Sequence, residues 1–207
     1  MGIAHAASPL PTYPLTHFPL IAMLTFNLST VSASLGLLYA VPNIWGVLKP
    51  ASFAAAARKF PRYTPVGFLL TLAATGWFLY YVSLETNQDF ANLKKLLYYA
   101  FGAVGVGTCL FVRDFLPVRG LAALLLLMAK AMTDTARLVE TDWRLVIVTW
   151  AYVFVFAGMW FTISPWRLRD LIHWSTASES RTRCCCGVRL GLGVFVLVLA
   201  FTAFRAS

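Results

Sequence analysis

Long apolar runs constrain this chain more than any other feature of its sequence. Helical membrane spans are predicted at 18–40, 64–83, 96–112, 119–138, 145–164 and 187–204. A helix that crosses a bilayer needs roughly 17–25 mostly apolar residues, and a backbone in lipid must satisfy its hydrogen bonds internally. Charged residues make up only 12% of the chain, about half the share that is usual in soluble domains. The sequence therefore predicts an all-α, polytopic transmembrane helical bundle with about six spans.

Six spans leave no room for a separate soluble domain. We expect a single transmembrane domain over 18–207, preceded by a flexible N-terminal segment over 1–17 that holds Pro9, Pro11 and Pro14. That segment has no Lys or Arg and so lacks the basic start of a secretory signal, and we expect the first span to be retained. The fourth span is the most ambiguous, because its uncharged core over 120–129 is too short to cross unless it includes Lys130 or folds back.

The basic residues are distributed unevenly between the two sides of this arrangement. The links after spans one, three and five hold 11 of the 17 Lys and Arg residues and three acids, whereas the other side holds six basic and five acidic residues. Cytoplasmic loops of membrane proteins are enriched in Lys and Arg. The asymmetry predicts that both termini lie on the non-cytoplasmic side of a membrane, which we take to be the bacterial cytoplasmic (inner) membrane.

The net charge of +9 raises the question of an anionic partner. Basic residues at the ends of membrane helices are attracted to anionic lipid headgroups, which accounts for the charge without nucleic acid. We therefore expect membrane lipids as partners and no nucleic acid. The predicted cytoplasmic contacts to anionic lipid are Arg58, Lys59, Arg62, Arg167, Arg169, Arg181 and Arg183.

A similar order of features occurs twice in the chain. A span followed by Pro42 and Trp45 leads into a basic link, and a span followed by Pro165 and Trp166 does the same 123 residues later. This pattern favours three helical hairpins, over 18–83, 96–138 and 145–204. The spacing of Leu168, Leu171 and Ile172 predicts a short interfacial helix over 166–174, with a weaker counterpart over 53–60. The simpler alternative is that any hairpin obeying the charge rule would show the same order.

Ionisable residues inside a membrane are costly and are candidates for function. Lys130, Thr133, Asp134 and Arg137 are spaced to share one side of the fourth span, and they could form a polar or substrate site. The alternative is that the span ends near Lys130 and that these side chains lie among the outer headgroups.

Small residues allow membrane helices to approach closely. Helix packing is therefore predicted at Gly102, Gly105, Gly187 and Gly191, the last two in a small-xxx-small pattern. A permeation path lined by the hydroxyls of the first span is the alternative role for the small polar residues.

The sequence contains no recognisable catalytic, cofactor or metal motif. His5, His17 and His173 are not spaced as helix ligand pairs, and the adjacent Cys184, Cys185 and Cys186 do not match zinc spacing. We therefore expect no cofactor and no enzymatic activity. The first functional hypothesis is an accessory or scaffolding subunit that packs in the bilayer, as a homo-oligomer or with a membrane-protein partner. The alternative is a small transporter or channel with its polar site near Lys130, Asp134 and Arg137.

Overall fold

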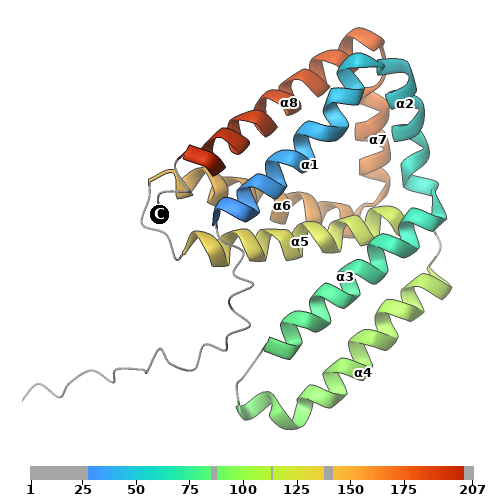
Figure 1. Cartoon of the computed structure of the whole chain (residues 1–207). Helices are drawn as coiled ribbons and strands as arrows, with labels where there is room; N and C mark the ends of the chain where they lie inside the picture. Colours follow the sequence, from blue (N-terminus) through green and yellow to red (C-terminus); the bar gives the residue numbers. More distant parts are fainter. Residues whose placement is uncertain (1–27, 85–87, 113, 138–141, 203–207) are drawn as a thin grey trace, which may run out of the picture.

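The structure is a computed structural model of the whole chain, and it describes residues 28–84, 88–112, 114–137 and 142–202 (Figure 1). Of these described residues, 92% lie in helices and none lies in a strand. The predicted all-α fold is confirmed. The expected N-terminal segment over 1–17 and the first part of the expected first span, 18–27, lie outside the described residues.

The described helices are of two kinds, long helices of 20 to 24 residues and shorter helices between some of them. In chain order they are α1 (Leu28–Leu48), α2 (Pro50–Lys59), the 3-10 turn η3 (Phe60–Arg62), α3 (Thr64–Leu84), α4 (Gln88–Phe111), α5 (Leu116–Ala136), α6 (Arg144–Ile163), α7 (Trp166–Ser175) and α8 (Glu179–Thr202). Among the described residues, five helices, namely α1, α3, α5, α6 and α8, are long and apolar enough to cross a membrane. They indicate an integral membrane protein, whereas the sixth crossing, expected in α4, stays a prediction.

Helices α1, α5, α6 and α8 surround the core of the bundle. Each presents a stripe of small or apolar residues to the others, because residues three and four apart share a helix face. The closest pairings are α1 with α8 and α5 with α6. Outside the stripes, the ring of Tyr39 on α1 lies edge-on to Trp150 on α6, with 5.2 Å between ring centroids. The core residues are Leu28, Val31, Leu35, Ala129, Met132, Ala136, Ile147, Ala151, Phe154, Val196 and Leu199.

Helix α3 packs on α5 away from this core, and α4 lies outermost, against α3 (Figure 1). The three expected hairpins would pair α1 with α3, α4 with α5 and α6 with α8. None of these is among the closely packed pairs of described helices. Helices α2 and α7 separate the two members of the first and third expected hairpins. Each carries the chain across the end of the bundle, so the following span packs on a helix distant in sequence.

The first span ends later than the sequence suggests. Pro42 follows the expected span, but in the structure it lies inside α1, which continues to Leu48. A proline removes one backbone donor, and membrane helices tolerate this when other groups compensate. Further along, the chain leaves the helix at Lys49, whose φ of −131° and ψ of 71° precede Pro50. The turn is therefore set by Pro50.

The recurrence predicted from the sequence is present, with a different spacing. Ser164 before Pro165 has a φ of −131° and a ψ of 74°, nearly the angles of Lys49. A 10-residue helix begins at Pro50 in the first case and directly after Pro165 in the second. The first residues of α3 and α8, Thr64 and Glu179, are as far apart in the chain as Pro50 and Pro165. The segment α1–α2–α3 thus corresponds to α6–α7–α8 with an offset of 115 residues, and the pairing of Pro42 with Pro165 is corrected to Pro50 with Pro165.

One end of the bundle collects all the basic links. Helices α2 and α7 lie against each other there, and the link from α4 to α5 turns at the same end (Figure 1). The opposite end holds the last turns of α3, α5 and α8 and the first turns of α4 and α6. The alternation of charge along the sequence therefore corresponds to two ends of one structure, and we call the first the basic end.

Candidate functional site

A polar cleft lies at the basic end, between α2 with η3 and α7. It has a volume of about 410 Å³ and is lined by Arg58, Pro61, Arg62, Arg169, Asp170 and His173. We call it the basic cleft. Its residues come from two segments more than 100 positions apart in the chain, and they meet because α2 and α7 pack together.

Arg58 holds the two sides of the basic cleft in place. Its Nε donates a hydrogen bond to Thr176 Oγ1 at 3.0 Å, and its Nη2 donates to the Thr176 carbonyl oxygen at 2.5 Å. Thr176 is buried just beyond the end of α7, and its own hydroxyl donates to the Ile172 carbonyl at 2.7 Å. Arg58 therefore both lines the cleft and ties α2 to α7.

The other charges of the basic cleft leave it cationic. Asp170 accepts hydrogen bonds from Arg169 Nε and Nη2 at 3.1 and 3.0 Å, so this pair largely cancels. Arg62 is exposed, and its side chain makes no hydrogen bond or ion pair with any described residue. A guanidinium group can donate two parallel N–H···O hydrogen bonds to the oxygens of one phosphate or carboxylate. The arrangement suits an anion that contacts Arg62 and the outer edge of Arg58.

The remaining predicted lipid contacts surround this cleft without lining it. Lys59, Arg167, Arg181 and Arg183 are all exposed. The Arg181 guanidinium lies over the Trp174 ring, 5.4 Å from its centroid. Arg167 borders a second, mostly apolar hollow at the corner of α6 and α7, with aromatic side chains that include Trp160 and Trp174.

The short helix predicted over 166–174 is present as α7. Leu168 is buried against the protein, whereas Leu171 is 44% exposed beside the aromatic corner of α6 and α7. The predicted apolar stripe is therefore divided: one leucine packs inward and the other stays at the surface.

The structure brings together only part of the polar group predicted on the fourth span. Lys130 Nζ lies 2.6 Å from Asp134 Oδ2, and both side chains are about half exposed, at 50% and 47%. The Lys130 ammonium also lies over the Tyr81 ring, 4.6 Å from its centroid. Thr133 instead donates to the Ala129 carbonyl, and Arg137 is exposed and forms no ion pair with a described residue. The four residues form one surface ion pair with two neighbours, and Lys130 also lines a groove between α3, α4 and α5.

The predicted glycine contacts are found at one of four positions. A Cβ on Gly105 would collide with the side chain of Thr75, so α4 and α3 approach closely there. A Cβ added to Gly102, Gly187 or Gly191 would meet nothing within 4 Å in the described part of the chain, so these glycines do not pack helices within it. On α8, the glycine that contacts α1 is Gly193. Gly187 and Gly191 lie on a face of α8 that points away from α1.

Two hydroxyls of the first span are hydrogen-bonded to backbone carbonyls, whereas the Ser32 hydroxyl is buried without a partner among the described residues. Ser29 Oγ donates to the Ala200 carbonyl of α8 at 2.9 Å, and Ser34 Oγ donates within its own helix to the Val31 carbonyl. The first bond joins α1 to α8, and the second stays within α1.

Residue spacing alone misses part of the basic cleft. By spacing, His173 is only an isolated histidine and Asp170 only one of the few acids on the basic side. The recurrence is the signal that points to His173, since it occupies the position in α7 that Arg58 occupies in α2, 115 residues earlier.

The fold and site define a polytopic, all-helical membrane protein with a cationic cleft at one end. No protein family matches the chain, and neither the curated proteins nor the solved structures include one with significant similarity to it.

Proposed function

We propose that this protein is a non-enzymatic scaffolding or accessory subunit of a membrane, held at its basic end by anionic lipid headgroups. The observation that carries the proposal is the basic cleft, in which the Arg62 side chain is free of partners among the described residues while Arg58 is fixed by Thr176. By the charge rule the basic end faces the cytoplasm, with α4 as a sixth crossing and both termini on the other side of a bacterial inner membrane.

The experiment measures how much anionic lipid the purified protein retains. The protein is reconstituted in nanodiscs of phosphatidylcholine with a minority of phosphatidylglycerol, and bound lipids are counted by native mass spectrometry. Arg62→Gln should reduce phosphatidylglycerol retention about tenfold or more, since a charged hydrogen bond contributes roughly 1.5–3 kcal/mol. Lys59→Gln is the matched control, because it removes the same charge from the same end outside the cleft lining.

The control shows whether the lipid is bound by the basic cleft itself or by the nonspecific attraction of all the cations at this end. A surface cation near anionic lipid contributes about 1 kcal/mol, so Lys59→Gln should cost roughly fivefold at most. Equal losses in the two variants would contradict a specific role of the basic cleft.

The scaffolding role is tested by the mass of the assembly. Light scattering of the protein in mild detergent should give a homo-oligomer or a complex with another membrane protein. A monomer that moves a solute across liposomes would contradict the proposal and support the transporter alternative.

A transporter is the second choice because of where Lys130 and Asp134 lie. A transport site needs polar groups around an enclosed path, and intramembrane charges usually face the bundle interior. In the structure these two side chains are half exposed and bonded to each other.

A further inference from the structure

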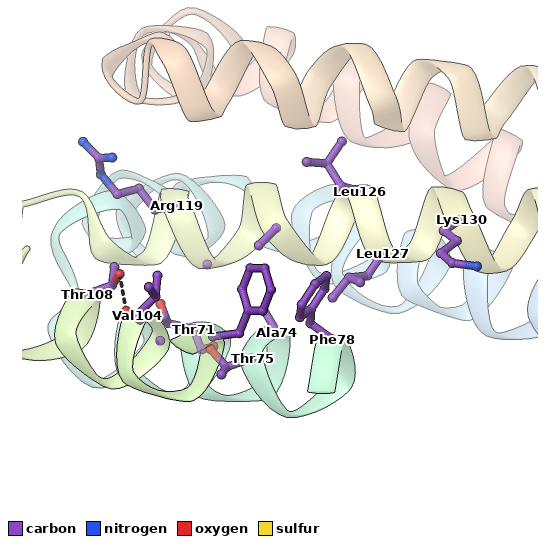
Figure 2. Close-up of a pocket in the computed structure, with 14 residues that line it drawn as sticks. Thr71, Ala74, Thr75, Phe78, Val104, Thr108, Arg119, Leu126, Leu127 and Lys130 are labelled. Atoms are coloured by element: carbon purple, nitrogen blue, oxygen red, sulfur yellow. Dashed lines mark hydrogen bonds between the residues drawn. The ribbon is translucent and has the colours of Figure 1, made fainter. Parts of the chain in front are cut away.

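A groove runs between α3, α4 and α5, separate from the basic cleft. It has a volume of about 420 Å³, which falls within the range of about 300–1,000 Å³ found for ligand sites. Figure 2 shows its lining side chains, with Arg119 at one end and Lys130 at the other. We call it the α3–α5 groove.

The groove exists because α3 contacts two helices that do not contact each other closely. On one side α5 approaches α3 at Gly120, where a Cβ would lie 2.8 Å from the Thr71 backbone nitrogen. On the other side α4 approaches α3 at Gly105, next to Thr75. Helices α4 and α5 are not a close pair, so a channel remains between them with α3 as its floor.

The polarity of the groove changes along its length. Thr71 and Thr108 lie toward the Arg119 end, whereas Phe78 and Leu127 lie toward the Lys130 end (Figure 2). Thr108 is bonded to the Val104 carbonyl, but the Thr71 hydroxyl has no hydrogen-bond partner among the described residues, although Thr71 is only 8% exposed. The Thr71 hydroxyl is enclosed between α3 and α5, because a Cβ added to Gly120 would lie 2.9 Å from it.

The two cations at the ends of the groove differ in what they can still bind. Lys130 is neutralised by Asp134 and covers the Tyr81 ring. Arg119 is exposed, its side chain forms no hydrogen bond or ion pair with a described residue, and its guanidinium points out of the groove at the basic end (Figure 2). The groove thus offers one available cation, at its more polar end. Along α5 the two residues are about 16 Å apart, at about 1.5 Å per residue.

We propose that the α3–α5 groove binds one acyl chain of an anionic glycerophospholipid, with the phosphate at Arg119. The ester groups near the headgroup then lie at the more polar end of the groove, beside Thr108, and the chain extends past Phe78 and Leu127 toward Lys130. The charge is complementary at the end where the cation is free, and the apolar part of the groove matches a hydrocarbon chain. This lipid site uses none of the residues of the basic cleft.

The test maps a lipid directly onto the groove. The protein is reconstituted in nanodiscs that contain a small fraction of phosphatidylglycerol carrying a photoactivatable diazirine in its acyl chain. After irradiation, mass spectrometry should find crosslinks on the groove face of α3, α4 and α5. Crosslinks spread evenly over exposed helix faces would overturn the proposal, and so would disulfide crosslinking of a second copy of the chain through cysteines placed in the groove.

Two variants separate the apolar and the charged parts of the site. Ala123→Phe fills the groove and should abolish the crosslinks there, while Ala73→Phe, on an exposed face of α3 outside the groove, should leave them unchanged. Arg119→Gln should lower the yield of groove crosslinks from the phosphatidylglycerol probe about tenfold, whereas Arg183→Gln at the same end should leave that yield unchanged.

The variants also decide the headgroup. If phosphatidylcholine with the same diazirine chain crosslinks equally well and Arg119→Gln has no effect, the assignment of an anionic lipid is wrong. Should Ala123→Phe fail to fold, the crosslink map of the unmodified protein and Arg119→Gln still decide the question. Arg62→Gln should leave the groove crosslinks unchanged, so failure at this site is distinct from failure at the basic cleft.

Discussion

A methyl group added at Gly193 should force α1 and α8 apart. Built on the structure, its carbon would lie 2.9 Å from the Ala40 backbone nitrogen and 3.0 Å from both the Gly36 carbonyl oxygen and Tyr39 Cβ. Two of these atoms belong to backbone and cannot turn aside. Gly193→Ala must therefore separate two helices that form the most closely packed pair in the described part of the bundle.

Gly191→Ala is the matched control on the same helix. A methyl there would meet nothing within 4 Å, and Gly191 is exposed. Both changes gain the same helix propensity, about 1 kcal/mol, so this contribution cancels between them. The difference is the steric cost of overpacking, about 1–3 kcal/mol.

The assay is thermal unfolding in detergent, followed by tryptophan fluorescence at one scan rate. For a chain of this size, 1 kcal/mol corresponds to about 2–4 °C in Tm. Gly193→Ala should therefore melt roughly 2–12 °C below Gly191→Ala. Equal melting temperatures, or a lower one for Gly191→Ala, would show that α8 presents its other face to α1 and would refute the packing described above.

Three further outcomes are expected. The unfolding free energy should change by only about 0–1 kcal/mol in each of Lys130→Ala, Asp134→Ala and the double variant, because the pair is half exposed. Thermal melts in detergent test this, and a strong defect in a single variant that the double variant rescues would refute it. Arg58→Ala should destabilise the protein by about 1–3 kcal/mol through loss of its two bonds to Thr176, seen as a lower Tm and faster proteolysis at α2; an unchanged Tm would count against the tie. Reporters fused after Arg58 and after Ser207 should lie on opposite sides of the membrane, and finding both on one side would contradict the predicted topology.

The candidate site shows how far residue spacing can lead. Lys130 and Asp134 are four residues apart, and the ion pair is present because such residues are neighbours on a helix. The basic cleft joins Arg58 and Arg62 to Arg169 and His173, and only the packing of α2 on α7 brings them together. No local rule predicts a contact over such a separation.

The glycines make the same point for helix faces. The small-xxx-small spacing of Gly187 and Gly191 indicates a packing face, but spacing does not state which way the helix is rotated. The rotation is set by the neighbours, and α8 turns Val196, Leu199 and Gly193 inward, with Gly193 against α1.

The sequence by itself determined the class of this protein, the positions of most spans and the gathering of basic links at one end. These follow from local physics, since apolar length and the charge of flanking residues act on each segment independently. The tertiary structure decided which helices pair, where the first span ends, and which glycines and arginines meet. Helix pairing depends on side-chain fit between segments far apart in the chain, as at Gly36 and Gly193, and that fit is a property of two surfaces together.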